Sequence, residues 1–279
     1  MFYSPTKMRG LLEKYGFNFK KNFGQNFIID ENVITNIIEK SGVDKDTLVI
    51  EIGPGAGSLT YKLSKYAKNV VCYEIDTKLK PILDEVLKDC NNVEVIFEDF
   101  LKSNVLDTVQ KYEYKKIYVV ANLPYYITTP IIVKLIEDKI PLEKIVVMVQ
   151  KEVGNRFKAV PGTKEYSSLS VFLDYYFDVK KLIDVSSNVF MPKPNVDSIV
   201  VEFIKHNKYN NVINEELFFK LVRDSFKQKR KTLRNNLKEY DLNKINEVLI
   251  KHGKDLSVRA EKLTIEEFIE MSNVLCKDK

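Results

Sequence analysis

The sequence has few cysteines and histidines, and neither residue type forms a recognisable site. The three cysteines, Cys72, Cys90 and Cys276, include no Cys-x-x-Cys pair, and their odd number argues against a disulfide framework. His206 and His252 have no cysteine or acidic cluster at ligand spacing nearby. A zinc site and a Ser-His-Asp triad are therefore both disfavoured, and we expect no metal.

Long apolar runs are also missing. No stretch approaches the ~18 apolar residues that a membrane-spanning helix needs. The first ten residues include basic side chains, but no apolar segment follows them, so we expect no signal peptide and a cytoplasmic location without a membrane partner. The chain has 279 residues, 44% of them hydrophobic, and this is enough for one large or two smaller folded domains.

The net charge is only +5, but it is unevenly distributed. Residues 220–238 include eight basic residues and one acidic residue, which gives +7. Residues 1–22 include five basic residues and one acidic residue, which gives +4. The rest of the chain is therefore acidic. Such an asymmetry fits contact with a polyanion, although on charge alone a solvated helix face is an equally good interpretation.

Short apolar runs alternate with helix-period segments from residue 47 to residue 150. The runs are rich in Val and Ile and apolar on both faces, so we interpret them as buried strands: Leu48–Ile52, Val70–Tyr73, Val93–Phe97, Ile117–Ala121 and Ile145–Val149. Two further strands are expected at 179–185 and 198–204, and a helix at 30–41 with Asp30 as its N-cap. This alternation predicts a doubly wound α/β sheet.

A polar segment at residues 206–211 breaks the pattern, and we place a domain boundary there. The prediction is an α/β domain over residues 1–206, with a basic N-terminal extension, followed by a small all-helical domain over 207–279. In the second part, Phe219, Val222 and Phe226 recur at helical spacing, and the basic residues occupy the other side of the same register.

A glycine-rich turn follows the first of these strands. Gly53, Gly55 and Gly57 alternate with other residues, and a helix begins at Ser58. Such a turn lets a ligand approach bare backbone, but a nicotinamide fingerprint would require glycine at position 58. The spacing after Glu51 resembles instead the S-adenosylmethionine loop of Rossmann-like methyltransferases. We therefore predict that Gly53 and Gly55 bind S-adenosylmethionine.

The next two strands end in acidic residues. Glu74, with Ile75 beside it, follows the second strand, where a carboxylate can accept hydrogen bonds from both ribose hydroxyls. Asp99 follows the third strand and can accept from the adenine amino group, while Phe100 supplies an apolar wall. The alternative, that the two acids are surface turn residues, is disfavoured by the neighbouring glycine loop.

The fourth strand ends in Asn122-Leu123-Pro124-Tyr125, which resembles the Asn/Asp-Pro-Pro-Tyr signature of methyltransferases that act on exocyclic amino groups. Asn122 Oδ1 and the Leu123 carbonyl can accept the two amino hydrogens of adenine N6, which aims the nitrogen lone pair at the donor methyl. Pro124 removes a competing N–H, and Tyr125 offers a ring on which the base can stack. Taken alone, a β-turn with a buried tyrosine would explain the motif better.

A second rigid loop follows Val189. Phe190 could hold a flipped base against Tyr125, and Lys193 could contact phosphate. The alternative is that Phe190 belongs to the core and the loop only leads into a strand.

Nearly the whole chain resembles the small-subunit ribosomal RNA adenine dimethyltransferases (the KsgA/RsmA family). Residues 19–27 are similar to the opening motif of that family, and the resemblance implies cofactor contacts by Gln25, Asn26 and Ile28. Residues 229–237 and 257–261 resemble its RNA-binding domain. They imply that the RNA contacts include Lys229, Arg230, Lys231 and Arg234.

The resemblance implies a Rossmann-like domain with a seven-stranded, mostly parallel sheet. It also implies dimethylation of N6 on two adjacent adenines near the 3′ end of 16S rRNA, with an immature 30S subunit as the partner and a monomeric enzyme. One alternative is a large-subunit dimethylase conferring macrolide resistance, although those enzymes usually have isoleucine where this chain has Leu123. A second alternative is a ribosome-assembly factor that acts mainly by binding. A third is a DNA adenine methyltransferase, but this function would not explain the Phe190 loop or the tail.

Overall fold

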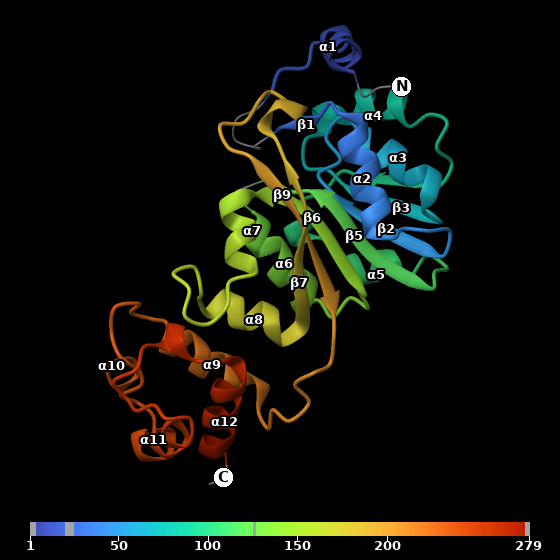
Figure 1. Ribbon diagram of the computed structural model, residues 1–279. Coiled ribbons are helices and arrows are strands. Elements are labelled where there is room, and N and C mark those ends of the chain that lie inside the picture. The colour runs from blue at the N-terminus through green and yellow to red at the C-terminus, as the bar shows by residue number, and fades with distance from the viewer. Residues whose placement is uncertain (1–3, 20–24, 125–126, 277–279) are drawn as a thin grey trace. The chain divides into compact units, whose positions relative to one another are not determined.

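The computed structural model describes residues 4–19, 25–124 and 127–276. The contacts within the chain divide it into two compact units (Figure 1). The first unit comprises Met1–Gly154 and Lys180–Ile204, and the second comprises Asn155–Val179 and Lys205–Lys279. The segment 155–179 therefore groups with the C-terminal part of the chain. The functional division at residues 206 and 207 stays a prediction.

A seven-stranded sheet organises the first unit. In spatial order its strands are β4 (Val93–Ile96), β3 (Asn69–Tyr73), β2 (Thr47–Ile52), β5 (Lys116–Asn122), β6 (Lys144–Gln150), β9 (Ser198–Lys205) and β7 (Phe177–Val185). The strands from β4 to β6 are parallel to their neighbours, and β9 runs antiparallel to β6. The predicted seven-stranded, mostly parallel sheet is confirmed. All six residues of β2 are buried, as expected for a strand covered on both faces.

Helices cover both faces of this sheet. The connections from β2 to β4 contain α3 (Ser58–Tyr66) and α4 (Lys80–Val86), whereas those from β4 to β6 contain α5 (Val105–Val109) and α6 (Thr128–Glu137). Parallel crossovers are right-handed, and the direction of strand addition reverses between β2 and β5. The first pair of helices therefore lies on one face and the second pair on the other (Figure 1).

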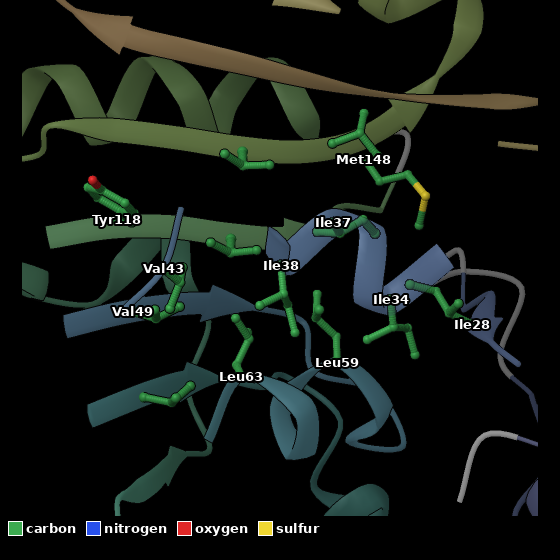
Figure 2. Packing of buried hydrophobic residues seen from close by; sticks show 14 of the residues in the cluster. Ile28, Ile34, Ile37, Ile38, Val43, Val49, Leu59, Leu63, Tyr118 and Met148 are labelled. Carbon is green, nitrogen blue, oxygen red and sulfur yellow. The ribbon is translucent and has the colours of Figure 1, made fainter. Parts of the chain in front are cut away.

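Helix α2 (Glu31–Ser41) packs on the same face as α3 and contacts it. It begins where predicted, because Asp30 Oδ1 accepts hydrogen bonds from the N–H groups of Asn32 and Val33 at 2.8 and 3.1 Å. Its buried side chains Ile34, Ile37 and Ile38 point at α3 and at the strands (Figure 2). The cluster includes Leu59 and Leu63 of α3, so it anchors the helix that begins directly after the glycine loop.

The N-terminal part adds a helix and a short ribbon. Helix α1 (Pro5–Lys14) is capped by Ser4 and buries Met8, Leu11 and Leu12 in an apolar cluster with α4. Strand β1 (Phe27–Ile28) pairs antiparallel with β8 (Phe190–Met191). Neither the helix nor the ribbon is predicted by the sequence pattern. The ribbon joins residues that lie more than 160 positions apart, and it brings the opening motif to the Phe190 loop.

The second unit is mainly helical. Helix α7 (Lys151–Phe157) follows β6 and includes the division between the units after Gly154. The α-helices that lie within the second unit are α8 (Ser168–Tyr176), α9 (Glu215–Ser225), α10 (Leu233–Asn236), α11 (Leu242–Lys251) and α12 (Ile265–Cys276). A separate buried cluster, which includes Phe218, Leu249 and Phe268, holds α9, α11 and α12 together. The predicted helical C-terminal region is confirmed. In the parts of the chain that the structure describes, no helix is both long enough and apolar enough to cross a membrane.

Candidate active site

Four adjacent parallel strands end at the same edge of the sheet, and each presents a predicted site residue there. Across β4, β3, β2 and β5, these are Asp99, Glu74, Gly53 and Asn122. The strand order reverses between β2 and β5, which is where open α/β sheets bind ligands. All four residues line one cavity with about 1000 Å³ of empty space, part of which is open to solvent.

The glycine loop needs its glycines. Gly55 has a φ of +59°, a backbone region that favours glycine, and a Cβ placed on it would lie 2.8 Å from the ring of Phe27. Two backbone bonds shape the loop: Gly53 N–H donates to the Tyr73 carbonyl, and Gly57 N–H donates to the Pro54 carbonyl, both at 2.9 Å. These bonds hold the loop in a tight turn whose residues Gly53, Pro54, Gly55 and Ala56 line the cavity.

Glu74 connects this loop to the N-terminal segment. Its side chain is only 5% exposed. Oε2 accepts from Gly55 N–H at 3.2 Å, and Oε1 accepts from Asp76 N–H at 2.8 Å. The Asp76 carboxylate in turn accepts from Gln25 Nε2 at 2.9 Å. Burial raises the pKa of Glu74 to about 7, although both N–H donors favour the ionised form.

Glu51 is a second buried acid at the cavity, and the sequence identified it only as part of the loop spacing. It is 1% exposed, and Cys72 Sγ donates to its Oε2 at 3.5 Å. Burial raises the pKa of Glu51 to about 7 and also raises the pKa of the Cys72 thiol. The signal in the sequence is an acidic residue inside an otherwise apolar buried strand.

Asp99 and Phe100 lie at the β4 end of the cavity. Asp99 Oδ1 accepts from Leu101 N–H at 3.1 Å, which holds the carboxylate in place. The buried ring of Phe100 meets the ring of Tyr73 edge to face, with centroids 5.3 Å apart. Ile75, which is half exposed, also lines the cavity. The predicted acceptor and apolar walls therefore lie side by side.

The Asn122 motif lies at the β5 end. Asn122 Nδ2 donates to the Asn26 carbonyl at 2.9 Å, so Oδ1 is the atom turned away from that carbonyl. Leu123 N–H donates to the Met148 carbonyl at 3.1 Å, and Pro124 continues the lining of the cavity. Tyr125 lies outside the described residues.

The opening motif reaches the cavity through four consecutive residues, Gln25 to Ile28. Sequence reasoning missed Phe27, whose ring lies against Gly55. Phe190 pairs with Ile28 across the ribbon, is 3% exposed and packs in the core cluster. Phe190 is not among the described residues that line the cavity. Stacking on a base, which would require its ring to be uncovered, stays a prediction.

The predicted RNA-binding residues are exposed. Lys193 lies between β8 and β9 in the first unit. In the second unit, the side chains around the start of α10 are exposed, namely Lys229, Arg230, Lys231 and Arg234. Lys229 Nζ donates to the Lys164 carbonyl at 2.5 Å. Their contact with RNA stays a prediction.

The cavity fits S-adenosylmethionine rather than a dinucleotide. Four carboxylates line it (Glu51, Glu74, Glu98 and Asp99), and none of the described lining residues is Lys, Arg or His. This suits a cationic sulfonium with hydroxyl and amino donors, whereas it would repel a pyrophosphate. The Ser58 hydroxyl is buried at the cavity without a hydrogen-bond partner among the described residues, so a polar ligand group can be accommodated there.

Comparisons with known proteins agree with this geometry. The model of a family described as ribosomal RNA adenine dimethylase matches residues 16–277. Ribosomal RNA small subunit methyltransferase A of Staphylococcus aureus (strain bovine RF122 / ET3-1) is 49% identical over 277 residues, which cover 96% of this chain and 93% of that protein.

Two solved structures share the fold. A dimethyladenosine transferase from Plasmodium falciparum has a TM-score of 0.72 and 26% identity, covering 88% of this chain and 95% of its own. The 23S rRNA methyltransferase ErmE has a TM-score of 0.69 and 24% identity, covering 90% and 99%, and supports the fold alone.

The family match extends over the glycine loop, the acidic strand ends and the Asn122 motif, as well as the helical tail. The predicted enzyme class, an RNA methyltransferase that uses S-adenosylmethionine, is thereby confirmed. The chain belongs to the ribosomal RNA adenine dimethylase family.

Proposed function

We propose that this protein transfers methyl groups from S-adenosylmethionine to N6 of two adjacent adenines in a hairpin loop near the 3′ end of small-subunit (16S) rRNA. The product is a pair of N6,N6-dimethyladenines, formed in the cytoplasm while the 30S subunit matures, by a monomeric enzyme. The observation that carries the proposal is the fixed Asn122 amide at the end of β5, beside the glycine loop. The name of the S. aureus relative supports the small subunit as the target.

The acceptor nitrogen explains why these residues are used. The N6 lone pair of adenine is delocalised into the ring and is a poor nucleophile. Asn122 Oδ1 and the Leu123 carbonyl accept its two hydrogens and favour a pyramidal nitrogen. The bonds to Asn26 and Met148 hold both acceptors in position. Catalysis therefore rests on positioning and on fixed dipoles, and no strong base is needed.

The cofactor is held by the acidic strand ends. Glu74 accepts from the ribose hydroxyls, and Asp99 accepts from the adenine amino group, with Phe100 and Ile75 as apolar walls. The bound cofactor supplies an electrophilic methyl on a sulfonium. The acidic lining complements that positive charge, and the order of the strand ends from β4 to β5 directs the reactive end of the ligand towards Asn122.

RNA recognition is shared between two regions. Lys193 and the basic residues near α10 contact phosphates, which position the RNA without reading its sequence. Tyr125 and Phe190 stack on the target adenine, and recognition of RNA shape supplies the remaining specificity. In this proposal residues 1–206 perform the transfer and residues 207–279 bind rRNA.

The test is methyl transfer from labelled S-adenosylmethionine to small subunits that lack the modification, followed by mass spectrometry of the rRNA digest. We expect N6,N6-dimethyladenine at two adjacent positions near the 3′ end, and none with Asn122→Ala. Label on large-subunit RNA instead would identify the protein as a large-subunit rRNA dimethylase of the kind that confers macrolide resistance. If neither subunit were labelled although the cofactor bound tightly, the remaining explanation would be a ribosome-assembly factor that acts mainly by binding.

A further inference from the structure

The ring of Phe27 covers the glycine loop. Two of its ring atoms, Cδ1 and Cε1, lie 2.8 Å from the point that a Cβ on Gly55 would occupy. The side chain is 6% exposed and lines the cofactor cavity. The N–H of Gly55 donates to Glu74 Oε2, so the ring lies against the residue that orients the ribose-binding carboxylate. Phe27 can therefore hold this part of the loop in place.

Phe27 belongs to an aromatic group that extends away from the cavity. Its ring centroid lies 5.2 Å from that of Phe19 and 6.0 Å from that of Phe17, and those two rings meet edge to face at 5.8 Å. The same apolar cluster contains Leu12 of α1 and Leu83 of α4. The aromatic group thus continues directly into the packing of the N-terminal helix.

The C-terminal end of α1 is bound to α4 by an ion pair and a hydrogen bond. Lys14 Nζ lies 2.6 Å from Glu85 Oε2, and Tyr15 Oη donates to the same oxygen at 2.5 Å. The residues of α1, all of them described, are not among those that line the cavity. The apolar cluster that α1 joins reaches the cavity through Phe27, Ala56 and Leu79, and Phe27 is the one of these whose ring lies against Gly55.

We propose that Phe27 is a positioning residue for S-adenosylmethionine and that α1 holds its ring against Gly55. The proposal rests on this cofactor, and it assigns a binding role to a helix that does not touch the cavity. If the ring is lost or released, Gly55 and Glu74 sample other arrangements. The apparent association constant is then the intrinsic one multiplied by the fraction of molecules that keep the binding arrangement.

The first experiment measures binding of S-adenosylhomocysteine by calorimetry, without RNA. We expect Phe27→Leu to raise Kd roughly tenfold and Leu12→Ala roughly threefold to tenfold. If α1 acts through the ring, the double variant binds about as well as Phe27→Leu alone, because coupled residues are not additive. Fully additive effects, or unchanged binding in Phe27→Leu, would overturn the proposal.

A surface pair gives a matched control that avoids the core. Glu85→Gln removes the charge that pairs with Lys14 of α1. Asp84→Asn removes the same charge from the preceding residue and weakens only the pair between Asp84 and Lys80, which lies within α4 at 3.2 Å. We expect Glu85→Gln to weaken binding about twofold to fivefold, the range of an exposed ion pair, and Asp84→Asn to leave it unchanged. Equal effects of the two variants would contradict a role for α1.

Kinetics separate positioning from catalysis. We expect KM for S-adenosylmethionine to rise in Phe27→Leu and Glu85→Gln while kcat at saturating cofactor is retained. A loss of kcat with unchanged KM would contradict the assignment. Because the calorimetry contains no RNA, a wrong RNA target would alter the transfer assay and leave these affinities as they are.

Discussion

Asn122 and Asn26 are joined by a hydrogen bond across 96 positions of sequence, from the side-chain Nδ2 of the first to the backbone carbonyl of the second, at 2.9 Å. An amide carries its donor and its acceptor on opposite sides. The bond therefore selects which side of Asn122 presents its acceptor oxygen. The cavity-lining segment at residues 25–28 thus sets the orientation of the Asn122 amide, which we propose receives the target base.

Substitution of Asn122 tests this arrangement. Asn122→Ala removes the acceptor, and we expect transfer to fall at least roughly a hundredfold while S-adenosylhomocysteine still binds. Asn122→Asp keeps an acceptor but places an oxygen against the Asn26 carbonyl, so we expect an intermediate loss, roughly tenfold. Single-turnover methyl transfer checks both. Full activity in Asn122→Asp would show that the bond to Asn26 is dispensable.

We expect cofactor affinity to depend on pH through Glu74. Its pKa is about 7 in the free protein, and hydroxyl donors from ribose favour the carboxylate. Below pH 7 the group must lose a proton to bind, so affinity rises with pH up to about 7 and then levels off. Calorimetry across this range checks the prediction. Glu74→Gln should bind weakly with little pH dependence, whereas Glu51→Gln should retain the dependence.

We expect Glu51 to make the free protein less stable at high pH. Its folded pKa of about 7 exceeds the ordinary value of 4.5, so the folded state holds the extra proton between these values. Stability therefore falls as pH rises through this window. Above pH 7, Glu51→Gln should gain up to about 3 kcal/mol in free energy of unfolding, and near pH 4 it should gain little. Urea unfolding of the wild type and of Glu51→Gln at both pH values measures this difference. An equal gain in free energy of unfolding at the two pH values would contradict the argument that burial raises the pKa of Glu51.

The basic residues near α10 should contribute to binding of the small subunit. Reversing the charge of Arg230, Lys231 and Arg234 should weaken binding and flatten its dependence on salt, because phosphate contacts release counterions. The matched control reverses three exposed lysines of the first unit, Lys40, Lys88 and Lys111. Filter binding at several salt concentrations gives the slopes. An unchanged slope in the tail variant would remove these residues from the RNA interface.

The sheet could be predicted because each of its central strands has a recognisable pattern in its own local sequence. Runs such as Ile145–Val149 are β-branched and apolar on both faces, and β6 indeed spans Lys144–Gln150. The N-cap at Asp30 could also be predicted from neighbouring residues alone. The topology rule for parallel sheets then brought Gly53 and Glu74 to one edge, so their presence in one cavity followed from the sequence.

The remaining features depend on contacts between distant residues. A strand of two residues such as β1 has no periodicity, and its partner β8 lies far along the chain. Nothing near Phe27 indicated that its ring would meet Gly55. The burial of Phe190 follows from the same ribbon, so the loop sequence alone could not distinguish a stacking residue from a core residue.

The ribbon of β1 and β8 also orders events during synthesis of the chain. A ribosome produces residues 27 and 28 early, and their partners, residues 190 and 191, only after most of the sheet has been made. Contacts between such distant residues form late. A nascent chain shorter than about 190 residues therefore has the glycine loop without the strand that pairs with Phe27, and the pocket becomes complete only after about two thirds of the 279 residues have been made.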